Sequence, residues 1–188
     1  TGVQTCALPI LSSDPKLVAF LCLSIINGLK SSGLKNCVKH FPGHGWAKED
    51  SHDFCAMDNR DFKEIYKNDI FPYEYLICEL NVVSSVMASH VIYEKCDDNP
   101  ASLSKFWLTD ILRSKLNFGG VIFCDDLSMQ GVKIKSGLLD LVDVAFVSGC
   151  DSLIICNDRD GVFKILNSYP VSSVPVGVRS ISTLKRGL

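Results

Sequence analysis

The chain has 188 residues and a net charge of −2, and 47% of its residues are apolar. This length fits one domain with an ample core, and the composition excludes a disordered or low-complexity chain. The nearly balanced charge, without a basic stripe, gives no reason to expect a nucleic acid or an anionic membrane surface as the partner. No uninterrupted apolar run is long enough to span a membrane.

The first ten residues, TGVQTCALPI, resemble a translated sequencing adapter. We therefore expect residues 1–10 to be a non-native leader, residues 11–188 to be a partial domain, and the chain to be a fragment. The nine cysteines are odd in number and lie mostly within apolar runs. Reduced, buried thiols and a cytoplasmic location are the better interpretation than a disulfide framework.

The first predicted helix begins after Asp14, which can act as a cap, and Pro15, which suits a first helical turn. Apolar side chains recur at helical spacing from Leu17 to Leu29, and Gly33 ends the run.

Short apolar strands then alternate with helices. The predicted strands are residues 36–38, 82–88, 121–123 and 152–156, and the predicted helices are residues 61–79, 105–116, 137–148 and 159–166. Such alternation is typical of parallel β/α units, and four units make half of an eight-stranded barrel. A doubly wound sheet would normally carry a glycine-rich phosphate turn after its first strand, and the sequence has none there. The predicted fold is therefore α/β, the C-terminal half of a TIM-type (β/α)8 barrel.

Two polar loops follow predicted strands. Residues 39–45 read KHFPGHG and are followed by DSH at residues 50–52, and residues 124–129 read CDDLSM. Glycine and proline favour an irregular backbone, while imidazole and carboxylate groups can transfer protons or bind ligands. Because active groups of parallel β/α proteins gather at the carboxyl ends of the strands, both loops are candidates for one site.

At these residues the chain resembles the bacterial β-N-acetylglucosaminidases of glycoside hydrolase family 3. The resemblance rests on KHFPGHG at 39–45 with DSH at 50–52, ASHVIY at 88–93, PAS at 100–102 with Trp107 and Leu108, and GVIFCDDLSM at 120–129. It implies a cytoplasmic, monomeric β-N-acetylhexosaminidase of peptidoglycan recycling. The implied substrate is a small carbohydrate, a muropeptide with terminal β-linked N-acetylglucosamine, and the implied reaction needs no cofactor and no metal.

The resemblance also implies roles for individual residues. Asp125 would be the nucleophile that forms a covalent glycosyl-enzyme, a role that suits a carboxylate ionised at neutral pH. His52 would act as general acid and base, since its ordinary pKa near 6.5 allows both roles at neutral pH. Asp50 would orient His52 and stabilise its protonated form. Lys39 and His40 would contact hydroxyl groups of the sugar.

Each assignment has a structural alternative. Asp126 rather than Asp125 would be the reactive group if Asp125 only capped the next helix. Asp50 and His52 would have no catalytic role if they belonged to a solvated surface loop. For His44 we expect a hydrogen-bonding role in holding its loop rather than a catalytic one.

Three further residues have two interpretations. His90 either lines the pocket or makes a structural hydrogen bond. Trp46 and Trp107 are expected to be packing groups rather than platforms for a sugar, and a helix would bury Trp107.

Two functions from other classes compete with the glycosidase. One is a metal-dependent hydrolase, with candidate zinc ligands His40, His44, Asp50, His52 and Cys55. The Phe-Pro-Gly interruption and the lack of a compact metal signature argue against it. The other is an inactive fragment, because half a barrel leaves sheet edges and apolar faces open. A histidine acid/base would also permit phosphorolysis, because it does not repel an incoming phosphate as a carboxylate would.

Overall fold

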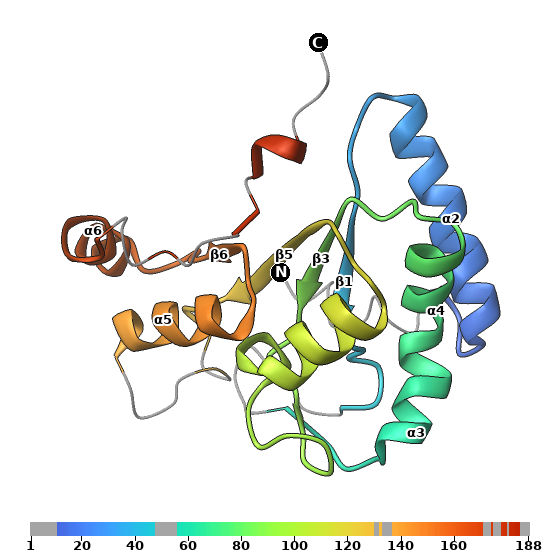
Figure 1. The fold of residues 1–188 in the computed structure, drawn as a ribbon, viewed down its shortest axis with the longest axis horizontal. Coiled ribbons are helices and arrows are strands. Elements are labelled where there is room, and N and C mark those ends of the chain that lie inside the picture. Colours follow the sequence, from blue (N-terminus) through green and yellow to red (C-terminus); the bar gives the residue numbers. More distant parts are fainter. Residues whose placement is uncertain are drawn as a thin grey trace.

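The centre of the fold is a four-stranded parallel sheet. The structure, a computed structural model, describes residues 11–47, 56–129, 132, 137–170, 174, 178–179 and 181–184, so the predicted leader lies outside the described residues. The strands are β1 (Cys37–Phe41), β3 (Ser85–Ala88), β5 (Val121–Asp126) and β6 (Ser152–Ile154), in the order β1-β3-β5-β6 (Figure 1). Each strand of this sheet pairs in parallel with the sheet's next strand in chain order, without the reversal of a doubly wound sheet. The predicted half barrel of parallel β/α units is confirmed.

The helix that precedes the sheet is α2 (Pro15–Ser31), and it begins as predicted. The Asp14 carboxylate accepts a hydrogen bond from the Lys16 backbone N–H at 2.8 Å, and Pro15 occupies the first turn. Gly33 follows the helix with a φ of 71°, in the left-handed region that glycine tolerates. The helix packs on α4 (Phe71–Glu74), beside β1 (Figure 1).

The predicted helix 61–79 forms one continuous helical run. It consists of α3 (Phe62–Ile65), a π-helical turn (Tyr66–Ile70), α4 and a second π-helical turn (Tyr75–Glu79). Asp61 caps its start by accepting the backbone N–H of Glu64 at 2.8 Å, and Pro72 lies in the first turn of α4.

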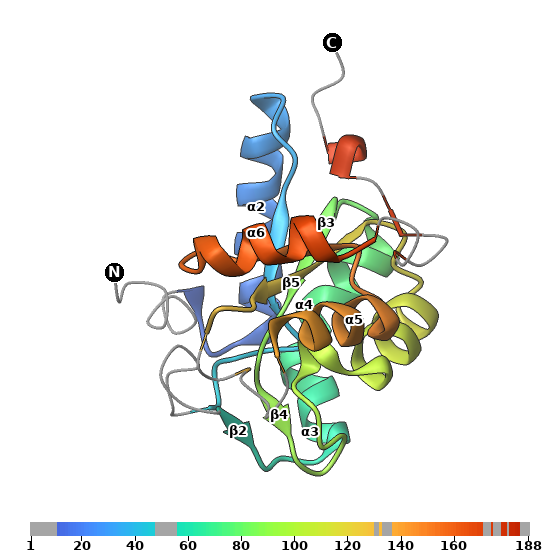
Figure 2. The same cartoon turned by 90° about the vertical axis from the view of Figure 1, so that its left-hand side faces the viewer.

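The remaining predicted helices are also confirmed. They are η4 (Phe106–Lys115), which has π-type hydrogen bonds, α5 (Leu138–Ser148) and α6 (Arg159–Ser168), with short 3-10 helices at Ala101–Leu103 and Ile181–Leu184. A small parallel sheet of β2 (Met57–Asp58) and β4 (Ile92–Tyr93) was not predicted, and it lies below the main sheet in Figure 2. No helix among the described residues is long and apolar enough to cross a membrane.

The core behind the sheet is organised around Trp107. This side chain is fully buried, and its ring lies 4.9 Å from that of Tyr93, 5.0 Å from that of Phe106 and 6.4 Å from that of Phe41. The prediction that Trp107 is a packing group is confirmed. Trp46, in contrast, is 53% exposed. More than half of its surface is therefore unpacked, and the prediction of a packing group is wrong for that part.

Candidate functional site

The carboxyl ends of the strands bring the two predicted loops together. Lys39 and His40 lie at the end of β1, His90 follows β3, and Asp125 and Asp126 close β5. The Nε2 atom of His40 lies 3.5 Å from Oδ2 of Asp125. Residues separated by more than eighty positions therefore share one edge of the sheet, as expected for parallel β/α units.

His40 occupies an irregular position in β1. The pairing of β1 with β3 shifts between Lys39 and Phe41, and such a bulge changes the direction of a side chain. The peptide bonds Lys39–His40 and Phe41–Pro42 are both cis. Burial lowers the pKa of His40 to about 4, although the negative charge of Asp125 opposes this change. At neutral pH the ring is thus uncharged, with one nitrogen as a donor and one as an acceptor.

The adjacent carboxylates of β5 have different surroundings. Asp126 is 8% exposed and accepts hydrogen bonds from the Ser128 backbone N–H (2.9 Å), the Ser128 hydroxyl (2.7 Å) and the Cys156 backbone N–H (3.0 Å). Burial raises the pKa of Asp126, but these hydrogen bonds outweigh burial and lower the pKa below its ordinary value. Asp125 is 18% exposed, and its carboxylate accepts the backbone N–H of Asp126 at 2.9 Å while its other oxygen faces His40.

His90 is held by two hydrogen bonds within the core. Its side chain is fully buried, with Nδ1 2.6 Å from the Ser102 hydroxyl and Nε2 3.0 Å from the Asp126 carbonyl. Because a carbonyl only accepts, Nε2 carries the proton and Nδ1 accepts from Ser102. Burial lowers the pKa of His90 and favours this neutral form. The interpretation of His90 as a structural hydrogen-bonding residue is therefore confirmed.

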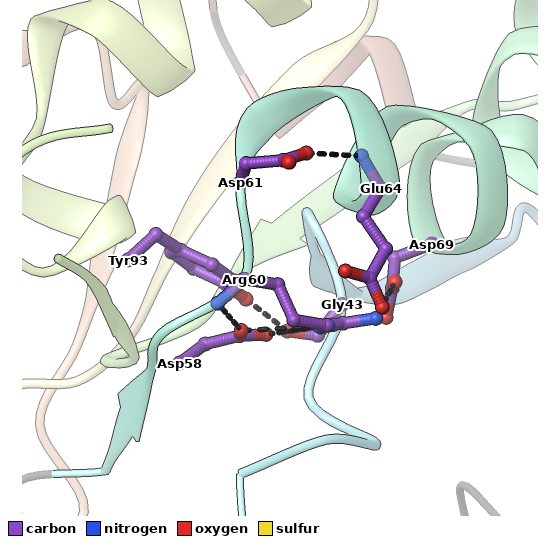
Figure 3. A network of polar contacts seen from close by, with 7 residues as sticks. All are labelled: Gly43, Asp58, Arg60, Asp61, Glu64, Asp69 and Tyr93. Carbon is purple, nitrogen blue, oxygen red and sulfur yellow. Dashed lines mark hydrogen bonds and ion pairs between the residues drawn. The ribbon is translucent and has the colours of Figure 1, made fainter. Parts of the chain in front are cut away.

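A buried ionic cluster lies beside the loop that follows β1 and was not predicted. Arg60 is 7% exposed; its Nε lies 3.1 Å from both carboxylate oxygens of Asp58, its Nη2 lies 2.6 Å from Asp58 Oδ2, and its Nη1 lies 2.7 Å from Asp69 Oδ2 (Figure 3). Burial alone would lower the pKa of Arg60, but the hydrogen bonds and charges of the two aspartates raise it. The spacing of Asp58 and Arg60 was visible in the sequence, whereas their pairing with Asp69 depends on the fold.

A cleft of about 890 Å³ opens between α2, β1 and α4. Its lining includes the polar side chains of Lys39, His40, Arg60 and Asp69 and apolar side chains of α2. Asp125 is not among the lining residues. The cleft and the candidate site therefore share His40, whereas the carboxylate of Asp125 does not border the cleft.

Two of the five predicted site residues, Asp50 and His52, lie outside the described residues, as does Cys55. Of the proposed zinc ligands, His40 and His44 are described, and their ring centres are 6.1 Å apart. Within the described part of the chain, no group of three or more His, Cys, Asp or Glu side chains is arranged to hold a metal ion.

The strand order and the carboxylate and imidazole groups at the strand ends define a barrel-type parallel α/β protein with an enzyme-like site. Residues 10–177 match the glycosyl hydrolase family 3 N terminal domain, and the chain belongs to this family.

Curated relatives agree with this family. The chain is 43% identical over 161 residues to a protein named beta-hexosaminidase from Haemophilus influenzae, a match that covers 86% of this chain and 46% of that protein. It is 40% identical over 172 residues to the beta-hexosaminidase of Aromatoleum aromaticum, covering 92% of this chain and 48% of the relative. The chain thus spans about half the length of these relatives.

Solved structures resemble the fold as well. CbsA from Thermotoga neapolitana superimposes with a TM-score of 0.79 at 30% identity, covering 93% of this chain and 40% of CbsA. NagZ from Neisseria gonorrhoeae, in a complex with N-trifluoroacetyl-D-glucosamine, superimposes with a TM-score of 0.76 at 36% identity, covering 86% of this chain and 44% of NagZ.

Proposed function

We propose that this chain carries the catalytic groups of a retaining β-N-acetylhexosaminidase that removes terminal β-linked N-acetylglucosamine from muropeptides. Membership of glycosyl hydrolase family 3 and the name beta-hexosaminidase of the relatives support the reaction class. The complex of the Neisseria protein with an N-acylated glucosamine supports the class of sugar.

Asp125 is the proposed nucleophile, and its difference from Asp126 is the observation that carries the proposal. Among the described residues, the carboxylate of Asp126 accepts hydrogen bonds from the turn after β5 and from Cys156 just after β6, so this group is engaged in holding structure. Asp125 keeps one carboxylate oxygen directed toward His40 across the strand ends. A carboxylate that is partly exposed and lightly hydrogen-bonded can approach the anomeric carbon and form a glycosyl ester.

Lys39 and His40 are proposed to bind sugar hydroxyl groups. Because the pKa of His40 is about 4, its neutral ring can donate to one hydroxyl and accept from another without competing for the negative charge of Asp125. Lys39 directly precedes His40 in β1, and its exposed side chain supplies a cationic donor. Both residues border the cleft beside α2.

His52 and Asp50 are proposed as the acid/base and its orienting partner. The support is the match of residues 50–52 to the family motif, together with their position in the chain shortly after His40. In the first step His52 would protonate the departing oxygen while Asp125 attacks the anomeric carbon. In the second step His52 would take a proton from water while the water oxygen attacks the anomeric carbon, and the bond from that carbon to Asp125 breaks, which releases the sugar and restores the carboxylate.

We further propose that the protein acts as a monomer in the cytoplasm. The described cysteines are free thiols, which supports a reducing compartment. Of these, only Cys124 and Cys150 are buried, so the prediction of buried thiols is wrong for the other described cysteines.

The test is hydrolysis of a chromogenic β-N-acetylglucosaminide and of purified muropeptides by the complete open reading frame that contains this chain, and by the chain alone. Proton NMR of the first product would follow the anomeric configuration, and mass spectrometry would detect the glycosyl adduct on Asp125. We expect retention and loss of turnover with Asp125→Asn. Activity that survives Asp125→Asn but disappears with a chelator would refute the proposal in favour of a metal-dependent hydrolase. Sugar 1-phosphate formed in phosphate buffer would identify phosphorolysis.

A further inference from the structure

Two segments of chain flank residues 48–55, and both are anchored to one buried cluster. The first flank follows β1 and contains Gly43 and Trp46, and the second begins at Ala56 and runs through β2 to Arg60. The second flank is held by the parallel pairing of β2 with β4, in which the Ile92 backbone N–H donates to the Ala56 carbonyl at 2.9 Å.

Arg60 connects the two flanks. Its guanidinium makes a forked contact with Asp58 of the second flank, and the same group lies over the Trp46 ring of the first flank, 4.8 Å from the ring centre. A planar guanidinium can bind a carboxylate and an aromatic face at once, which the ammonium group of lysine cannot reproduce. Arg60 therefore contacts the chain on both sides of residues 48–55.

Asp69 and Tyr93 hold the first flank at Gly43. A Cβ atom added to Gly43 would lie 2.5 Å from Asp69 Oδ1, so the backbone passes directly over this carboxylate, which itself accepts from Arg60. The Tyr93 hydroxyl donates a hydrogen bond to the Gly43 carbonyl (Figure 3). Tyr93 belongs to β4, the strand that also pairs with the second flank.

We propose that Arg60 is a positioning residue for proton donation, because it ties the two flanks of residues 48–55 together and so restricts where Asp50 and His52 can reach. This inference rests on the proposed function, in which His52 is the acid. Arg60 itself does not touch the reacting atoms in this scheme. The nucleophile Asp125, on β5, is attached to the fold independently of the cluster.

The inference predicts a dependence on the leaving group. Acid assistance matters most when the departing alcohol is a poor leaving group, whereas a nitrophenolate departs with little help. The kcat/KM value reports the steps up to the first irreversible bond cleavage, so misplacing the acid should lower kcat/KM for alkyl glycosides much more than for nitrophenyl glycosides. A general loss of folded protein would lower both values equally.

The experiment compares Arg60→Lys and Tyr93→Phe with wild type in the complete open reading frame. The Tyr93→Phe variant keeps the ring against Trp107 and removes only the hydroxyl group that holds Gly43, so it tests the same idea with little risk to folding. For each variant, kcat/KM is measured on a methyl and on a 4-nitrophenyl β-N-acetylglucosaminide.

Arg113→Lys is the matched control. Arg113 also makes a partly buried ion pair, with Asp151, and donates to the carbonyls of Phe118 at 2.9 Å and Gly120 at 2.5 Å. These partners precede β5 and β6, at the ends of the strands opposite to Asp125. The same substitution there perturbs a comparable cluster away from the proposed site.

We expect Arg60→Lys to lower kcat/KM for the methyl glycoside at least about tenfold more than for the nitrophenyl glycoside, since general acids contribute roughly a hundredfold or more. Tyr93→Phe should act in the same direction, and Arg113→Lys should change both values by the same factor. Equal losses on both substrates in the Arg60 and Tyr93 variants, or the same selectivity in the Arg113 variant, would overturn the inference. If the wild-type enzyme is active and depends on Asp125, such a result would overturn the role of Arg60 and leave the proposed function intact.

Discussion

The neighbouring residues Asp125 and Asp126 should respond in opposite ways to substitution. Asp126→Ala removes the acceptor of two backbone N–H groups and one hydroxyl, and these come from Ser128 and Cys156. Asp125→Ala removes the acceptor of one backbone N–H, that of Asp126 itself. We therefore expect Asp126 to matter for stability and Asp125 for activity.

The magnitude follows from the hydrogen bonds. A hydrogen bond to a charged group contributes about 1.5–3 kcal/mol, so three such bonds set an upper limit of about 4.5–9 kcal/mol. Removing a buried carboxylate also relieves its desolvation, which offsets part of this loss. We expect Asp126→Ala to lower the free energy of unfolding by about 2–4 kcal/mol. Asp126→Asn should cost about 1 kcal/mol, because an amide oxygen can replace Oδ1, which accepts both backbone N–H groups.

The assay is urea unfolding of the wild type and of single variants at Asp125 and Asp126, followed by fluorescence and circular dichroism. Because the pKa of Asp126 is lowered, its contribution is present above an ordinary pKa near 4 and is lost as the pH falls through the folded value. The Asn variant should lack this acid sensitivity. If Asp125→Ala destabilises as much as Asp126→Ala, the division of roles between the two carboxylates is refuted.

Three further predictions concern the surroundings of the site. Gly43→Ala should destabilise the protein by about 1–3 kcal/mol in a denaturant titration, because its Cβ would lie 2.5 Å from Asp69 Oδ1 and 2.6 Å from Asp69 Cβ; unchanged stability would contradict this contact. Since the pKa of His90 is lowered, its contribution is present above about pH 6.5 and is lost as the pH falls, by up to about 1.4 kcal/mol per pH unit. His90→Gln should be less stable at pH 7 but show a shallower decline between pH 6.5 and 5, and an identical slope would argue against a neutral His90. Trp107→Ala should cost about 3–5 kcal/mol in thermal or urea unfolding, and a cost below about 1 kcal/mol would show that Trp107 does not organise the core.

Much of the fold was predictable from local signals. Apolar runs followed by polar loops predicted the four parallel strands, and the cap at Asp14 predicted the start of α2. The placement of Asp125 and His40 at one sheet edge followed from the rule that strand ends gather in parallel β/α proteins. The roles of Asp50 and His52 stay predictions.

The missed features depend on contacts between distant residues. β2 and β4 are two residues long each, so neither has a run that a periodicity argument can detect. The Arg60 cluster joins β2 to the helical run through Asp69. From the sequence alone, a charged residue such as Arg60 near the start of a helix is equally well interpreted as a solvated side chain. The engagement of Asp126 depends on Cys156, thirty residues further along the chain.

The order of the strands also bears on how the chain acquires its shape. Each strand of the main sheet pairs with the strand that precedes it in the chain, so every β/α unit that leaves the ribosome finds its docking edge already synthesised. Within this sheet, pairing can proceed from β1 toward β6 as the chain is synthesised, because each strand pairs with one that is already made. If translation paused between β3 and β5, the intermediate would expose the edge of β3, and this is the edge with which β5 later pairs.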